Sequence, residues 1–143
     1  MSEVRTKRNL SYAPDAALNT LAANNASIYV TSTKPNEAVA VMLDQMRDLR
    51  ENEVSPDAIR KYGGYFLTTY YLGEETDAGQ AGELARYELI GGGWRNAFQY
   101  LDRVRAVTPA QVKAVANKYF TNVRFAVVGN PADVDKTVFL KAL

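Results

Sequence analysis

The spacing of the apolar residues changes at Pro35 of this 143-residue chain, and that change constrains the fold most strongly. Before Pro35 the pattern is extended: Leu10 and Tyr12 share one face of a period-two stretch, and Ser27–Ser32 is β-branched and aromatic. We expect these two segments to pair as an antiparallel hairpin with a loop around residues 19–26. The first part of the chain therefore predicts a small sheet.

From Pro35 onward helical spacing predominates, and a start signal precedes each expected helix. Ser55 and Thr108 each stand before a proline, the arrangement of a capping residue followed by proline at the first helical position. Three consecutive glycines, 91–93, are expected to stop the third helix. The predicted helices run from Pro35 to about Asn52, from Pro56, from Thr76, over a short stretch at residues 98–104, from Pro109, and at the C-terminus.

The expected second helix carries an aromatic stripe that we interpret as core packing, because aromatic residues at helical spacing usually pack inside a protein. Two glycines within the same helix, Gly63 and Gly64, predict the close approach of a neighbouring helix. The stripe consists of Tyr62, Tyr65, Phe66, Tyr70 and Tyr71.

A late segment, Phe125–Val128, is apolar on both faces, as in a central strand that is covered from either side. Gly129 is expected to end it, and the strand would return to the early hairpin. We therefore predict an α+β fold with one core, in two layers: a mixed sheet with the helices packed on one face.

The composition excludes several kinds of chemistry. The chain contains neither histidine nor cysteine. Zinc hydrolases hold their metal with His, Cys and carboxylate ligands, and serine or cysteine hydrolases usually need an imidazole base. We therefore expect no catalytic residue, no metal site and no cofactor in this chain.

Charge and hydropathy also narrow the choice of partner. Seventeen Lys and Arg balance sixteen Asp and Glu, and the densest basic cluster, residues 5–8, is too small for a nucleic-acid surface. No apolar run approaches the roughly 20 residues of a membrane-spanning helix. We expect no nucleic-acid partner and no membrane segment, while the compartment stays open.

The first residues carry a motif. Residues 1–9 are expected to be the tail of a helix that gives way at Asn9 to extended chain. The pattern V-R-T-x-x-x-L-x-Y over residues 4–12 resembles the second domain of the insulinase/pitrilysin family, which includes mitochondrial processing peptidase. Further similar segments follow in the family's order over essentially the whole chain: Thr33–Pro35, Val54–Pro56, Val107–Val112, Asn117–Phe120 and Val127–Asn130.

The resemblance implies a peptidase built from paired similar domains, an inverted-zincin arrangement. The first domain carries an H-x-x-E-H zinc site; the second lacks metal and completes the substrate chamber. A chain without histidine matches only the second. We expect residues 1–143 to form a single, N-terminally truncated partial domain, with a zinc-bearing H-x-x-E-H domain or subunit as partner and a peptide as substrate.

Arg5 and Tyr12 match the family's Arg/Tyr pair in type and in their separation of seven residues, so the resemblance assigns them to substrate binding. Two simpler interpretations stay open: a solvated arginine at a helix end, and a strand tyrosine half inside the core. The alternative for the whole chain is a structural or interaction module with no peptidase role.

Overall fold

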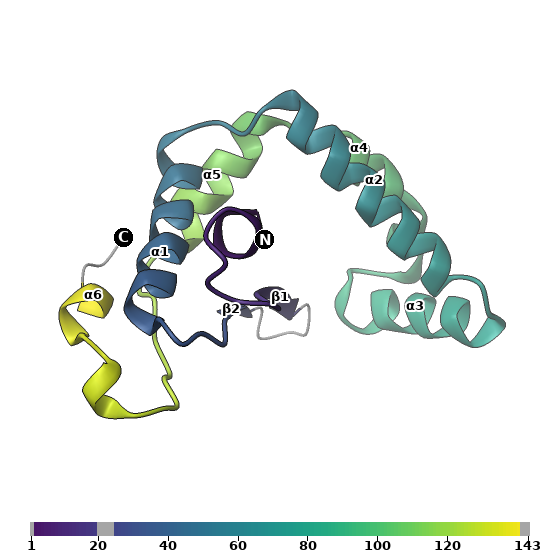
Figure 1. Ribbon diagram of the computed structural model, residues 1–143. Helices are drawn as coiled ribbons and strands as arrows, with labels where there is room; N and C mark the ends of the chain where they lie inside the picture. Colours follow the sequence, from purple (N-terminus) through teal and green to yellow (C-terminus); the bar gives the residue numbers. More distant parts are fainter. Residues whose placement is uncertain (1, 20–24, 141–143) are drawn as a thin grey trace. The chain divides into compact units, whose positions relative to one another are not determined.

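A computed structural model describes residues 2–19 and 25–140 of the chain (Figure 1). The chain divides into two compact units. The sheet-bearing unit combines Met1–Asn52 with Lys113–Leu143, and the helical unit is Glu53–Val112. The described chain is mostly helical with a small two-stranded antiparallel sheet, which confirms the α+β class.

The first strand of the hairpin lies later in the chain than expected, and the second, expected at Ser27–Ser32, begins and ends earlier. Strand β1 is Asp15–Asn19 and strand β2 is Asn25–Tyr29, paired antiparallel with Ala17 opposite Ser27. The predicted first strand at Leu10 and Tyr12 is wrong, because Leu10 turns into the core instead of joining the sheet. The antiparallel pairing is confirmed, whereas most of the predicted loop lies outside the described residues.

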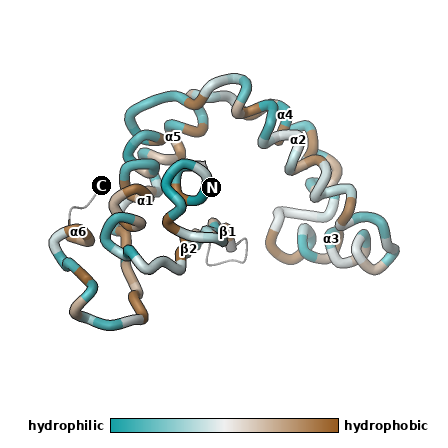
Figure 2. The backbone as a smooth tube through the Cα atoms, viewed as in Figure 1, coloured by the Kyte–Doolittle hydropathy of each residue, from teal (hydrophilic) through white to brown (hydrophobic). Residues whose placement is uncertain are grey.

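The prediction of a central strand at Phe125–Val128 is wrong for the described residues. This segment has no strand assignment, and Val128 is fully exposed. Figure 2 shows it as apolar chain running on from helix α5, Pro109–Tyr119. A strand needs a neighbour, and the only sheet in the described part of the chain joins β1 to β2. The predicted return to the hairpin, and the mixed sheet, are therefore not found there.

The core of the sheet-bearing unit forms where helix α1, Pro35–Glu51, meets the N-terminal turn. Val4, Leu10, Ala38 and Val41 make one buried cluster. On the predicted stripe of α1, Val39 and Leu43 are buried, as expected. A side-chain amide of helix α5 bonds to the end of α1: Asn117 Nδ2 donates to the Arg50 carbonyl at 2.8 Å. A 3-10 turn η3, Pro131–Asp133, and helix α6, Lys136–Leu140, complete the unit.

The helices of the helical unit begin where their capping residues predict. Ser55 Oγ accepts a hydrogen bond from Ala58 N at 3.1 Å, and Thr76 Oγ1 accepts one from Gly79 N at 3.0 Å. These caps satisfy amides that have no partner within a helix. The unit contains α2, Pro56–Gly73; α3, Asp77–Ile90; a 3-10 turn η2, Trp94–Gln99; and α4, Tyr100–Arg105.

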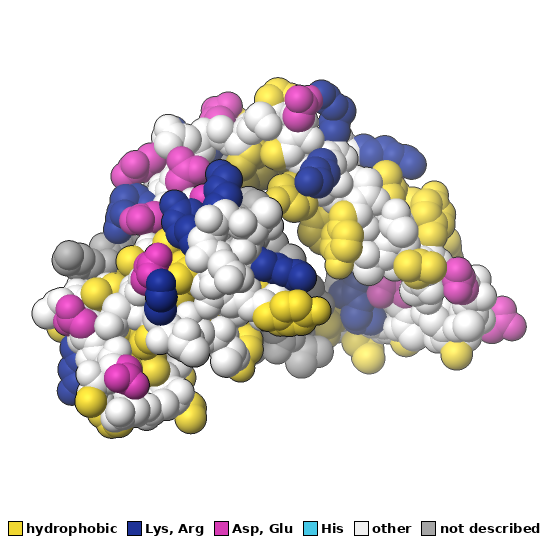
Figure 3. Space-filling model, viewed as in Figure 1, with side chains coloured by type: hydrophobic (Ala, Val, Ile, Leu, Met, Phe, Trp, Pro, Cys, Tyr) yellow, Lys and Arg dark blue, Asp and Glu magenta, His cyan; other side chains and the backbone are white. Residues whose placement is uncertain are grey.

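Four of the five residues in the aromatic stripe of α2 are exposed, so the interpretation of the stripe as core packing is wrong for them. Tyr62 and Tyr65 are 63% and 65% exposed, and Figure 3 shows apolar side chains at the surface around α2. Tyr70 alone of the stripe stacks on another helix, with its ring centroid 5.2 Å from that of Tyr100. The expected close approach at Gly63 is also wrong, because no other atom lies within 4 Å of a Cβ built there.

Candidate functional site

The N-terminal turn holds the motif residues in fixed places. Turn η1, Ser2–Thr6, is one turn of π-helix, and the chain after it closes with two backbone bonds: Leu10 N to Val4 O at 2.9 Å, and Asn9 N to Arg5 O at 3.0 Å. Asn9 has a φ of +50°, the left-handed conformation that asparagine tolerates. The left-handed residue and the apolar contact between Val4 and Leu10 resemble a Schellman helix end, but the two bonds span six and four residues, one more each than in that motif.

The apolar anchors of this turn are Val4 and Leu10, which are 6% and 5% exposed. Sequence reasoning placed the end of the helix near Asn9 but missed the role of this residue in the turn. The signal was present: an asparagine just beyond a helix end, followed at once by an apolar residue, is typical of this motif. The turn fixes the direction in which the neighbouring side chains leave the core.

Arg5 and Tyr12 flank these anchors and lie together. The Arg5 Cζ atom is 4.6 Å from the centroid of the Tyr12 ring, a cation–π contact. Tyr12 is 82% exposed and Arg5 is also exposed, so the interpretation of Tyr12 as half in the core is wrong. A contact of this kind at an exposed site contributes about 0.5–1 kcal/mol. It orients both side chains while leaving their polar ends in water.

Charge pairing near the turn sets Arg5 apart from the other cations. Glu3 accepts hydrogen bonds from Lys7 Nζ at 2.5 Å and from Arg8 Nη1 at 2.7 Å. The bond from Lys7, and then that from Arg8, lower the pKa of Glu3 below its ordinary value of 4.5. Within the described residues no carboxylate pairs with Arg5.

The guanidinium of Arg5 and the hydroxyl of Tyr12 define what the pair can bind. Among the described residues no atom accepts a hydrogen bond from the Arg5 guanidinium or bonds the Tyr12 hydroxyl. A guanidinium presents five N–H donors in a planar fork, and a phenol adds one O–H donor. Together they suit a carbonyl or carboxylate oxygen. The pair can therefore bind and polarise such an acceptor.

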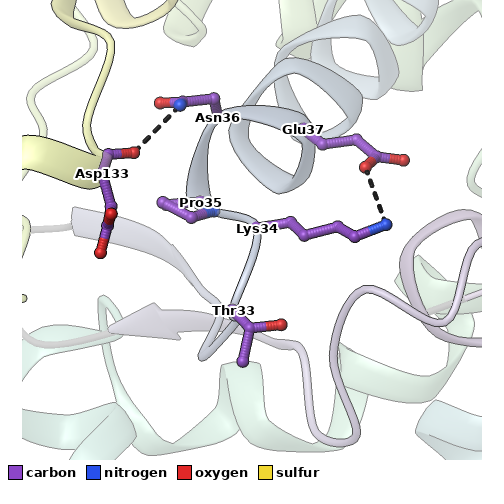
Figure 4. A pocket seen from close by; sticks show the side chains of 6 residues that line it. All are labelled: Thr33, Lys34, Pro35, Asn36, Glu37 and Asp133. Carbon is purple, nitrogen blue, oxygen red and sulfur yellow. Dashed lines mark hydrogen bonds and ion pairs between the residues drawn. The ribbon is translucent and has the colours of Figure 1, made fainter.

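A shallow hollow of about 340 Å³ lies at the start of α1 (Figure 4). The Asn36 side chain in it is already paired: Asn36 Nδ2 donates to the Asp133 carbonyl at 3.0 Å, and Asn36 Oδ1 accepts from Asp135 N at 2.8 Å. Lys34 Nζ lies 3.7 Å from a Glu37 carboxylate oxygen. The hollow thus joins α1 to the segment around η3, and neither residue of the Arg5/Tyr12 pair lines it.

The described residues contain no group of three or more His, Cys, Asp or Glu side chains placed to hold a metal ion. Their helices include none with the length and apolar character needed to cross a membrane. No known protein family and no curated protein matches the chain. The Arg5/Tyr12 pair is therefore the candidate site on its own geometry.

Proposed function

We propose that this chain is the non-catalytic, C-terminal substrate-binding part of an insulinase/pitrilysin-type zinc metallopeptidase. The Arg5/Tyr12 pair would face a zinc-bearing H-x-x-E-H domain or subunit and hold the peptide substrate. The observation that supports this function is the 4.6 Å approach of the Arg5 Cζ atom to the Tyr12 ring, with no described residue hydrogen-bonded to the polar end of either side chain. The fold is part of the proposal: a partial inverted-zincin domain with a mixed sheet and helices on one face.

The chemistry follows from the groups that the turn presents. In a closed chamber the guanidinium and the phenol would donate hydrogen bonds to the carbonyl oxygen of the scissile peptide. These bonds strengthen as negative charge develops on that oxygen, because donors that are already oriented need no reorganisation. The metal in the partner would supply the activated water, and this chain would hold and polarise the peptide.

The first experiment measures cleavage of a quenched fluorescent peptide by the chain mixed with an H-x-x-E-H protein of the same family. Arg5→Ala removes the guanidinium, whereas Tyr12→Phe keeps the ring under Arg5 and removes only the hydroxyl. We expect each variant to lower kcat about 10²-fold or more, as for loss of an oxyanion donor. Arg8→Ala is the matched control, because Arg8 is paired with Glu3 and lies outside the pair.

A measurement of peptide binding without turnover separates substrate binding from catalysis. With zinc removed by a chelator, fluorescence anisotropy of the uncleaved peptide should still report weaker binding for Arg5→Ala and unchanged binding for Arg8→Ala. Equal turnover and equal binding for all variants would show that the Arg5/Tyr12 pair has no role in substrate binding.

One observation favours a second candidate, a structural or interaction module. The helical unit exposes aromatic side chains on α2, and exposed apolar patches mark protein contact surfaces. A chain of this kind would bind a protein partner through α2 with no dependence on Arg5. Pull-down of a partner that is lost with Tyr62→Ser but kept with Arg5→Ala would support this function.

A further inference from the structure

Glu3 holds two of the three cations that surround the candidate site. Its two carboxylate oxygens take one cation each: Lys7 Nζ donates to Oε1 and Arg8 Nη1 donates to Oε2. The same Nη1 atom of Arg8 also donates to the backbone carbonyl of Glu3 at 3.1 Å. The carboxylate of Glu3 therefore has a cation on each oxygen, and both cations are tied to one residue.

These ion pairs contribute little to the anchoring of the turn. The side chains of Lys7 and Arg8 are exposed, and exposed ion pairs add little to stability because water screens them. The turn is anchored to α1 by its apolar residues, since Val4 and Leu10 belong to the buried cluster of the sheet-bearing unit. The effect of the Glu3 network is therefore on the charge of the surface.

That charge is part of what a ligand of the Arg5/Tyr12 pair meets. Lys7 and Arg8 are two and three residues from Arg5, so their Cα atoms lie within about 11 Å of its Cα atom. This is close to the Debye length of about 10 Å at 0.1 M salt, so the neighbouring charges act at the site. With Glu3 ionised, Lys7 and Arg8 add one net positive charge there instead of two.

We propose that Glu3 is a specificity-determining residue of the Arg5/Tyr12 site: by holding the two neighbouring cations, it suits the site to uncharged peptide segments. Three unpaired cations within four residues would favour acidic peptides, because they attract a carboxylate wherever it lies in the peptide. The inference rests on the proposed function, since it assumes that the pair binds a peptide carbonyl.

The test compares two labelled peptides, fluorescein-Ala-Ala-Gln-Leu-Gln-Ala-Ala and the same peptide with glutamate in place of both glutamines. Each is titrated with the full 143-residue chain mixed with the zinc-free H-x-x-E-H protein, and anisotropy gives the Kd at low ionic strength. The parent chain should bind the two peptides with Kd values within about threefold of each other. Glu3→Gln should tighten binding of the glutamate peptide about threefold, the size expected for an exposed ion pair, and leave the glutamine peptide unchanged.

Two control variants separate charge from structure. Glu3→Gln/Lys7→Gln restores the net charge of the turn, so it should return the ratio of the two Kd values to that of the parent chain. Asp102→Asn makes the same change of charge in the helical unit, where Asp102 pairs with Arg105 on α4, and should leave the ratio unchanged. The gain from Glu3→Gln should also vanish in about 1 M salt, where the Debye length falls to about 3 Å.

The possible failures are distinguishable. The proposal for Glu3 would be overturned if Glu3→Gln changed both Kd values equally or neither of them, or if the altered ratio persisted in Glu3→Gln/Lys7→Gln. A parent chain that prefers the glutamate peptide more than tenfold would overturn it as well. Failure of the proposed function gives another result: either no binding of both peptides, or binding that Arg5→Ala leaves intact, and the inference would then fall with it.

Discussion

At the scale of single residues, the candidate site depends on the backbone conformation of Asn9. Its φ of +50° allows the two bonds that close the turn and bury Val4 and Leu10. For a residue that has a Cβ atom but lacks the side-chain amide of asparagine, this left-handed conformation costs about 1–2 kcal/mol. The position of Arg5 over Tyr12 therefore depends on the backbone of a third residue, Asn9.

We predict that Asn9→Ala lowers the free energy of unfolding by about 1 kcal/mol, while Asn9→Gly leaves it unchanged or slightly raised, because glycine adopts positive φ freely. Urea denaturation followed by circular dichroism measures both variants. Peptide binding to the Arg5/Tyr12 pair should weaken with Asn9→Ala and persist with Asn9→Gly. Equal stability of the two variants would mean that this turn is not formed in solution.

Glu3 gives a prediction about pH. Hydrogen bonds from Lys7, and then from Arg8, hold the pKa of Glu3 below 4.5 in the folded chain. Because the folded pKa lies below the unfolded one, the stabilisation is present above pH 4.5 and is lost as pH falls through the folded pKa. NMR titration should place the Glu3 midpoint below 4.5, and Lys7→Gln should raise it. Lys61→Gln, on α2, should leave it unchanged; an unperturbed Glu3 in the parent chain would contradict the pairing.

At the scale of elements, the starts of helices could be predicted from the sequence. Which residues pack against the apolar face of each helix could not. The capping box of α5 shows why. Thr108 Oγ1 accepts from Gln111 N at 3.3 Å, and Gln111 Oε1 accepts from Thr108 N at 2.9 Å. Both partners lie three residues apart, so the sequence contains the whole interaction.

Strands and buried stripes depend on residues far away in the chain or outside it. The pattern at Phe125–Val128 indicates backbone suited to a sheet but does not supply the neighbouring strand. The stripe on α2 likewise identifies an apolar face and not what covers it. For the candidate site, motif spacing identified Arg5 and Tyr12. Their contact through the ring face could not be predicted, because it depends on the turn at Asn9.

Two glycines provide a matched test of how helices α2 and α3 pack. A Cβ at Gly63 of α2 would meet no other atom within 4 Å, so Gly63→Ala should raise the free energy of unfolding by about 0.5–1 kcal/mol. A Cβ at Gly79 of α3 would collide with the Gly73 carbonyl oxygen, so Gly79→Ala should lower it by about 1–3 kcal/mol. Thermal unfolding measures both. Destabilisation by Gly63→Ala would instead indicate a close neighbour on α2.

At the scale of the whole molecule, the two units differ in how much apolar surface they bury. Within the described residues, the helical unit has one buried apolar side chain, Ala97, at 3% exposure. All the others belong to the sheet-bearing unit: Val4, Leu10, Ala38, Val39, Val41, Leu43 and Ala116. The helical unit is held instead by its caps and by ring contacts such as Tyr70 on Tyr100. Local stability should follow this difference, because amides open most easily where few apolar contacts hold them.

We therefore predict that hydrogen exchange in α1 is at least tenfold slower than in α2, measured by mass spectrometry on peptides from Pro35–Glu51 and Pro56–Gly73. The two helices are of similar length, so the comparison isolates packing from fraying at the ends. A dilution series supplies the control, since protection of α2 that grows with protein concentration would come from a second copy covering its aromatic face. Protection of α2 equal to that of α1 at every concentration would contradict the prediction. It would mean that the Tyr62 face is covered within the chain itself, leaving no free aromatic surface for a partner.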